Sequence, residues 1–289
     1  MPIIEPVIRP PSEAESFLLQ VTLGCSADTC NFCGAYKNKP FRPKDQREIF
    51  SDIAHYARRY PNTRRIFLMD GDALVLSNRK LVPILRELKK AFGRLTRISA
   101  YANGSNIARK SDQELAELRA HKLTLIYLGL ESGSQDVLDR CQKSSTVEQM
   151  ITGVQRAAKA GIKSSVIVLL GLGSREQSQE HIKETIKALN RMQPRYLSFL
   201  SLMIIPGTPL AEQVQNGAFV MLNSKELLTE AYEILHGLDL KKTIFRSDHA
   251  SNYLPLEGAL PKDKQKILET LQAALNGTVR LRPEIFRGL

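Results

Sequence analysis

Three cysteines near the amino end of the sequence are the residues best suited to chemistry. Cys25, Cys30 and Cys33 lie within nine residues, in the spacing C-x4-C-x2-C. In a sequence that shows no secretion signal, clustered thiols indicate a metal site rather than a disulfide framework. Neighbouring thiolates repel one another unless a cation neutralises them, and sulfur ligands favour zinc or iron–sulfur clusters. We therefore expect these three cysteines to be metal ligands.

The number of available ligands separates the kinds of metal centre. A structural zinc ion needs four ligands, whereas the nearest histidine is His55 and the fourth cysteine, Cys141, follows Cys33 by 108 residues. Plant-type ferredoxins hold a [2Fe–2S] cluster with the same spacing and a downstream cysteine, but they are small acidic domains. Closed zinc and an electron-transfer [2Fe–2S] centre stay as alternatives. The favoured centre is a [4Fe–4S] cluster with three protein thiolates and one iron open to a non-protein ligand.

Short branched runs alternate with amphipathic segments along the 289 residues. The runs predict strands at residues 17–23, 65–69, 97–101, 124–128, 164–170 and 196–204. Apolar residues at helical spacing predict helices at residues 45–60, 81–92, 146–160 and 176–192 and one that begins at Asp112. Such alternation is typical of βαβ crossovers and a parallel sheet. We therefore predict an α/β fold, a partial parallel barrel of six β/α units.

Glycine-rich or polar motifs follow each predicted strand. After the cysteine motif they lie at residues 70–72, 103–106, 129–133, 171–173 and 206–209. In parallel β/α folds the loops at the carboxyl ends of the strands converge on the active site. Each motif alone is a weak signal, but six in phase, with a metal motif in the first, predict a functional site at this edge.

Residues 17–210 resemble the radical S-adenosylmethionine (SAM) superfamily. The cysteine motif with Phe32 before its last cysteine carries the resemblance, although the usual spacing is C-x3-C-x2-C. Residues 70–72 lie where the family has Gly-Gly-Glu/Asp, with Asp70 in place of the first glycine. The motifs at residues 129–134 and 171–173 are similar to the coproporphyrinogen-oxidase-like subgroup.

The resemblance implies a [4Fe–4S] cluster and SAM as cofactors. Reductive cleavage of SAM would yield a 5′-deoxyadenosyl radical that abstracts a hydrogen atom from a substrate. Gly71 would bring backbone carbonyls to the SAM ammonium group, Glu131 would accept from the ribose hydroxyls, and Lys143 would hold the carboxylate. The full set of cofactor-binding residues that the resemblance implies is Phe32, Gly71, Asp72, Asn103, Glu131, Lys143, Ser165, Gly171 and Pro206. A non-catalytic SAM and iron–sulfur protein, or one that carries haem, is the alternative function.

The carboxyl-terminal part has a different composition. We expect the barrel to span residues 1–215 and a helical extension, residues 216–289, to close it. Residues 245–253, between two helical patterns, collect polar, aromatic and titratable groups in one loop, and such loops can line a pocket. His249 titrates near neutral pH and, with Tyr253, is a candidate catalytic residue. Arg246 could hold an anionic group of the substrate.

The net charge of +11 favours anionic partners. The basic residues are scattered, aromatic residues are 6% of the chain, and tryptophan is absent. We therefore expect a small anionic substrate rather than nucleic acid, and an electron donor such as flavodoxin or ferredoxin. No apolar stretch approaches the ~20 residues of a membrane span, so we expect a cytoplasmic protein without membrane contact.

Overall fold

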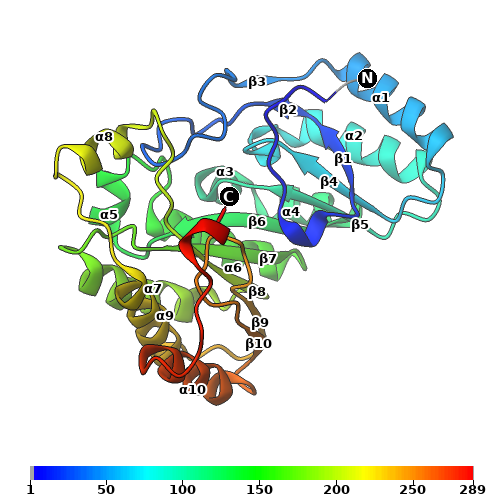
Figure 1. The fold of residues 1–289 in the computed structure, drawn as a ribbon. Helices are drawn as coiled ribbons and strands as arrows, with labels where there is room; N and C mark the ends of the chain where they lie inside the picture. Colours follow the sequence, from blue (N-terminus) through cyan, green and yellow to red (C-terminus); the bar gives the residue numbers. More distant parts are fainter. Residues whose placement is uncertain (1–2, 289) are drawn as a thin grey trace. The chain divides into compact units, whose positions relative to one another are not determined.

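The computed structural model describes residues 3–288 and has a mixed α/β fold (Figure 1). In these residues a mostly parallel central sheet of eight strands is flanked by helices. The chain forms two compact units. The first comprises the chain up to Thr29 together with Cys33–Leu128 and Thr152–Ser164, and the second comprises Cys30–Phe32, Gly129–Ile151 and the chain from Ser165 onward.

The first unit contributes four neighbouring parallel strands to the sheet. They are, in spatial order, β1 (Phe17–Gln20), β4 (Arg65–Met69), β5 (Arg97–Tyr101) and β6 (Leu123–Glu131), whose last three residues belong to the second unit. A separate antiparallel pair joins β2 (Thr22–Leu23) to β3 (Arg42–Pro43). The helices of this unit are α1 (Gln46–Arg59), α2 (Asn78–Ala91), α3 (Gly104–Arg109) and α4 (Asp112–Ala120).

Local side chains fix where these helices begin. The Asp45 carboxylate accepts from the first backbone N–H groups of α1, and Ser111 forms a reciprocal capping box with Glu114 at the start of α4. The apolar faces of α1 and α2 are buried, as Ile49 and Leu85 show. The sequence of each helix therefore sets both its start and the side that faces the sheet.

The second unit continues with β7 (Lys163–Leu170), β8 (Tyr196–Ser201), β9 (Thr243–Arg246) and β10 (Glu257–Leu260). The pairs β7–β8 and β8–β9 are parallel, and β9–β10 is antiparallel. The remaining helices are α5 (Gln135–Arg140), α6 (Val147–Lys159), α7 (Ser178–Met192), α8 (Pro209–Gln215), α9 (Ser224–Gly237) and α10 (Lys264–Leu275). Most of α6 belongs to the first unit.

The sequence pattern anticipated the class of the fold and most of its elements. The strands at residues 65–69 and 97–101 have the predicted bounds, whereas the predicted strand 17–23 is divided between β1 and β2, and β8 ends at Ser201 rather than at residue 204. β9 and β10 are additional strands within the part that was expected to be helical. Each has four residues, too few to show an alternating pattern. The boundary at residue 215 stays a prediction.

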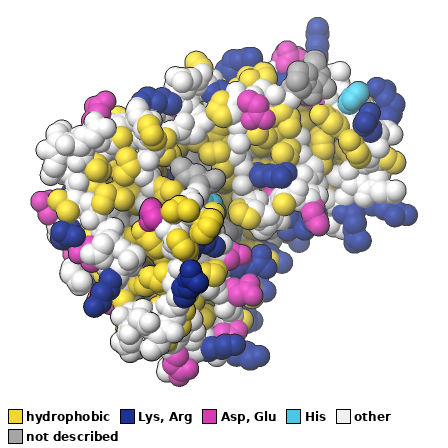
Figure 2. All heavy atoms as spheres, viewed as in Figure 1, with side chains coloured by type: hydrophobic (Ala, Val, Ile, Leu, Met, Phe, Trp, Pro, Cys, Tyr) yellow, Lys and Arg dark blue, Asp and Glu magenta, His cyan; other side chains and the backbone are white. Residues whose placement is uncertain are grey.

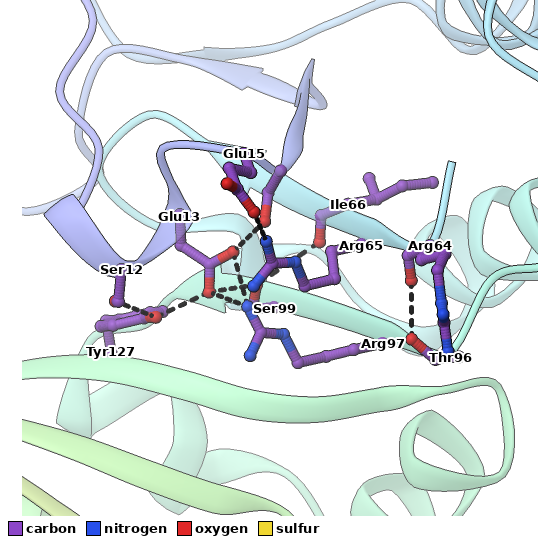
Figure 3. Close-up of polar contacts among 11 residues, drawn as sticks. Ser12, Glu13, Glu15, Arg64, Arg65, Ile66, Thr96, Arg97, Ser99 and Tyr127 are labelled. Carbon is purple, nitrogen blue, oxygen red and sulfur yellow. Dashed lines mark hydrogen bonds and ion pairs between the residues drawn. The ribbon is translucent and has the colours of Figure 1, made fainter. Parts of the chain in front are cut away.

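A buried carboxylate organises the amino-terminal segment of the first unit (Figure 3). The 3-10 helix η1 (Pro11–Glu13) ends at Glu13, which is fully buried. Its carboxylate accepts from the Arg97 guanidinium at 2.8 Å, from Ser99 Oγ at 3.0 Å and from Tyr127 Oη at 2.6 Å. Burial and the bond to Glu13 raise the pKa of Tyr127. Because Arg97 is the first residue of β5, this network lies at the amino end of that strand, away from the carboxyl end where the predicted site lies.

The surface agrees with the scattered charge of the sequence. Figure 2 shows Lys and Arg side chains distributed over the viewed face, with acidic and apolar side chains between them. Across residues 3–288, no helix combines the length and apolar character that crossing a bilayer requires.

Candidate functional site

The cysteine motif forms a loop that begins two residues after β2. Cys25 and Cys30 are half-buried and Cys33 is exposed, and in the described part of the chain none of the cysteines forms a disulfide. The backbone N–H of Ala27 donates to Cys25 Sγ at 3.4 Å, as N–H groups do around metal-bound thiolates. The loop therefore carries all three cysteines that the sequence predicts as metal ligands, although within residues 3–288 the structure gathers no three His, Cys, Asp or Glu side chains into a group that could hold a metal ion.

Gly71 lies directly against Cys25. Its N–H donates to the carbonyl of Gly24 at 3.0 Å. A Cβ added at Gly71 would lie 2.4 Å from Cys25 Cβ and 2.5 Å from Cys25 Sγ. Any side chain at this position would therefore displace the cysteine. The structure brings together a predicted cofactor-binding residue and a predicted metal ligand, and it supplies the reason for a glycine here.

Asp72 accepts a hydrogen bond from Ser26, the residue that follows Cys25. Its buried carboxylate accepts from Ser26 Oγ at 2.9 Å, from Asn106 Nδ2 at 2.5 Å and from the backbone N–H of Leu74 at 3.1 Å. The backbone of Asn103, the residue that caps α3, also donates to Asp72. Burial raises the pKa of Asp72, and the hydrogen bonds from Asn106 and Ser26 oppose that rise. The structure thus brings Asp72 and Asn103 together and ties both to the cysteine loop.

The middle of the cysteine loop is fixed within the second unit. The N–H of Asn31 donates to the Cys141 carbonyl at 3.0 Å, its side-chain amide donates to the Arg140 carbonyl at 3.0 Å, and its own carbonyl accepts from the N–H of Leu210 at 3.1 Å. Cys141 is 1% exposed, and burial raises the pKa of its thiol to about 12. A thiol held in its protonated form is a poor metal ligand, so Cys141 is an unfavourable addition to the three cysteines that the sequence predicts as ligands.

Glu131 and Lys143, twelve residues apart, are brought together. Lys143 Nζ lies 3.5 Å from Glu131 Oε1, and both side chains are 14% exposed. Glu131 ends β6 with a φ of +63°, and a Cβ on Gly129 would lie 1.9 Å from Glu131 Oε1. Gly129 therefore leaves the space into which the carboxylate folds. Such a pair offers two functions side by side: the carboxylate can accept hydrogen bonds from hydroxyl groups, and the ammonium group can bind a carboxylate.

A buried chain of polar groups supports the loop after β7, and sequence reasoning missed it. The N–H of Gly171, at φ +84°, donates to Glu230 Oε2 at 2.7 Å, and Ser178 Oγ donates to Glu230 Oε1 at 2.6 Å. His181 Nδ1 lies 2.8 Å from Ser132 Oγ, and its Nε2 lies 3.9 Å from Glu230 Oε2. Burial raises the pKa of Glu230 to about 7 and lowers that of His181 to about 4.

In the sequence, Glu230 and His181 are only a carboxylate and an imidazole in helical patterns. Their shared burial arises from the packing of α7 against α9. The chain of contacts joins the residue after Glu131 to Gly171, so it links the loops after β6 and β7 within the second unit.

Three other predicted cofactor-binding residues have different surroundings. Ser165 pairs with Tyr196 at the start of β8, so the length of β7 separates it from Gly171. Phe32 packs against an apolar cluster of the second unit, as a core aromatic would. Pro206 is exposed in the turn before α8. The structure does not bring Ser165 to the end of β7 that carries Gly171.

His249 and Tyr253 lie in a segment that the carboxyl-terminal residues hold. His249 Nδ1 accepts from the N–H of Ser251 at 3.1 Å, which leaves the proton of the neutral ring on Nε2. Burial lowers the pKa of His249. Tyr253 donates to Glu284 at 2.5 Å, and the Arg287 guanidinium lies 4.0 Å from the centroid of its ring. The imidazole is therefore oriented, whereas the phenol is engaged by the carboxyl-terminal residues.

Comparisons with known proteins identify similar sequences and similar folds. A family model described as the radical SAM superfamily matches residues 19–189. The heme chaperone HemW of Bacillus subtilis (strain 168) is 23% identical over 216 residues, which are 71% of this chain and 55% of that protein. The chain spans about half the length of the curated relatives it matches first.

Two solved structures have similar folds. Coproporphyrinogen III oxidase (HemN) from Escherichia coli aligns with a TM-score of 0.59 and 17% identity, over 76% of this chain and 52% of that one. The radical SAM methyltransferase TsrM from Kitasatospora setae, with cobalamin and a [4Fe–4S] cluster bound, aligns with a TM-score of 0.57 and 17% identity, over 70% of this chain and 39% of that one.

Proposed function

Because the chain belongs to the radical SAM superfamily, we propose that it is an enzyme that cleaves SAM reductively to abstract a hydrogen atom from a small substrate. The cofactors of the family are a [4Fe–4S] cluster and SAM. The observation that carries the proposal is the loop of three cysteines, none in a disulfide, packed at Cys25 against a glycine that no other residue could replace without a shift.

The residues present fit these cofactors. Cys25, Cys30 and Cys33 would hold three irons and leave the fourth for SAM. When bound, the reduced cluster supplies the electron that breaks the sulfonium of SAM and so starts hydrogen abstraction. Two of the three ligand positions, Cys25 and Cys33, are close enough to Tyr36 to raise its pKa, together with burial and Asp70.

The other residues bind and orient SAM and the substrate in this proposal. Lys143 holds the SAM carboxylate, and Glu131 accepts from the ribose hydroxyls, because their contact places a cation and an acceptor side by side. Gly171 donates its N–H to Glu230, and its backbone contacts the adenosine. His249 offers an oriented Nε2–H that can donate a hydrogen bond to the substrate.

The substrate is proposed to be a small anionic molecule, and the reductant a small acidic protein such as flavodoxin or ferredoxin. The net charge of +11 supports both, because basic side chains scattered over the surface raise the local concentration of anions. The similar folds include a methyltransferase and an oxidase, so the likeness of fold does not select one substrate.

Anaerobic reconstitution tests the proposal. With iron, sulfide, dithionite and SAM, the protein is expected to release 5′-deoxyadenosine and methionine, measured by liquid chromatography. Cys25→Ala, Cys30→Ala and Cys33→Ala should each abolish release and the visible absorbance of the cluster. A fully loaded protein that binds SAM but releases neither product would contradict catalysis.

The likeness to a heme chaperone supports a second candidate function, a haem-carrying protein that binds SAM without consuming it. Titration with haem, followed by its absorbance, separates the two candidates. Stoichiometric haem binding without 5′-deoxyadenosine release would favour the carrier, and release without haem binding would favour the enzyme.

A further inference from the structure

Asp70 adopts a left-handed backbone conformation, the one that glycine favours. It follows β4 with a φ of +68°, in the left-handed region, and it is fully buried. Glycine adopts this conformation without steric penalty, whereas a residue with a side chain does not. A strained, buried aspartate persists only where its carboxylate makes interactions that outweigh the strain.

The carboxylate of Asp70 is satisfied by a buried cation. Lys39 Nζ lies 2.8 Å from Asp70 Oδ2, and the side chains are 5% and 0% exposed. Lys39 also donates to the backbone carbonyls of Ile4 at 2.6 Å and Pro6 at 2.9 Å. Gln20 Nε2 donates to Asp70 Oδ2 at 3.2 Å. The ion pair thus has the further hydrogen bonds that a buried pair needs.

The same carboxylate accepts a hydrogen bond from Gly24, the residue that precedes Cys25. Asp70 Oδ2 accepts from the N–H of Gly24 at 3.2 Å, and the N–H of the next residue, Gly71, donates to the Gly24 carbonyl at 3.0 Å. Both polar backbone groups of Gly24 are therefore fixed by Asp70 and Gly71. Gly24 itself has a φ of +70°, so the chain turns sharply into Cys25 at this point.

We propose that the buried Asp70–Lys39 pair is a positioning device for Cys25, which fixes the Gly24 backbone so that the thiolate meets the cluster in one orientation. The inference rests on the proposed role of Cys25 as a cluster ligand. Asp70 acts on Cys25 through the Gly24 backbone. Groups that orient a ligand in this way commonly change metal affinity by about 10–100-fold when they are removed.

Two substitutions of Asp70 separate the parts of this device. Asp70→Gly relieves the backbone strain and removes the acceptor for the Gly24 N–H. Asp70→Asn keeps an oxygen for that N–H but leaves the Lys39 charge unbalanced. A matched control is Asp52→Asn, because the Lys44–Asp52 pair in the same unit is also buried, with both side chains 6% exposed, and Asp52 lies on α1 rather than in a loop at a strand end.

The readouts are the rate of iron loss to a chelator, the paramagnetic resonance spectrum of the reduced cluster, and thermal unfolding of each reconstituted protein. We expect iron loss to accelerate about tenfold or more in Asp70→Gly, with a broadened spectrum, and to accelerate less in Asp70→Asn. Asp52→Asn should lower the melting temperature but retain the wild-type spectrum and rate.

The outcomes distinguish this inference from the proposed function. If wild type takes up no cluster, the proposed function fails. If wild type is loaded and both Asp70 variants match its rate and spectrum, the positioning role fails while the function stands. Equal acceleration in Asp52→Asn would also overturn it, because general destabilisation would then explain the effect. Should Asp70→Gly not fold, the comparison of Asp70→Asn with Asp52→Asn decides.

Discussion

Replacing Gly71 with alanine tests whether the contact with Cys25 controls cluster binding. The added Cβ would lie 2.4 Å from Cys25 Cβ, whereas ordinary contact begins at 3.4 Å, so the cysteine must retreat by about 1 Å. The φ of Gly71 lies outside the left-handed region, so the backbone accepts alanine and the clash alone is introduced. Metal–ligand distances tolerate about 0.2 Å. The displacement therefore exceeds what a ligand can absorb.

We expect Gly71→Ala to fold and to lose most of its cluster. Overpacking of this kind typically costs about 1–3 kcal/mol of unfolding free energy, and displacing the ligand should weaken iron retention by about 10–100-fold. The assay is the iron and sulfide content of each protein after anaerobic reconstitution, with chemical unfolding of the cluster-free protein as the measure of stability.

Gly93→Ala provides the matched control. It lies just after α2 in the same unit, and an added Cβ there has no heavy atom within 4 Å. The control should keep wild-type iron content and stability. If Gly71→Ala retains the same iron as Gly93→Ala, either Cys25 is not a ligand or its position is not set by Gly71, and the reasoning from the contact is refuted.

Three further predictions concern the second unit. Cys141→Ala should keep full iron content, because the buried thiol of Cys141 stays protonated. Loss of iron from this variant would show that Cys141 is a ligand. Lys143→Ala should weaken SAM binding about tenfold at unchanged iron content, by loss of a charged hydrogen bond, as measured by equilibrium binding; unchanged affinity would remove Lys143 from the site. In Glu230→Gln, His181 remains, and the stability that comes from its neutral form is lost as pH falls from 6.5 through about 4. In His181→Gln, Glu230 remains, and the stability that comes from its protonated form is lost as pH rises from 4.5 through about 7. Each loss amounts to about 3 kcal/mol of unfolding free energy, measured by chemical unfolding at pH values from 4 to 8. If the unfolding free energies of the two variants change with pH in the same direction, the assignment is wrong.

Local signals in the sequence made the strands and their loops predictable. The strand at residues 65–69 contains an apolar run, residues 66–69, that lies between Arg65 and Asp70, and glycine and polar residues mark the motifs that follow the strands. The strands β9 and β10 were not predictable in this way, because their pattern over four residues is set by pairing with each other and with β8. Their existence depends on partners that the local sequence does not identify.

The supporting contacts of the site were unpredictable for a related reason. The pattern at residues 70–72 showed that Asp70 departs from glycine, but its role depends on Lys39, 31 residues away. Glu13 bonds to Arg97 and Tyr127 across 84 and 114 residues. Such pairs are fixed by the fold as a whole, whereas a metal motif such as the cysteine loop is compressed into one short segment.

Backbone strain gives these supporting residues a common physical meaning. Asp70 and Glu131 each lie at the carboxyl end of a strand, with φ values of +68° and +63°. A left-handed conformation costs a side-chain-bearing residue roughly 1–2 kcal/mol, and glycine at either position would avoid that cost. Each carboxylate instead contacts a lysine, Lys39 or Lys143. In each unit, therefore, the strain of an acidic residue at a strand end is offset by the lysine that its carboxylate contacts.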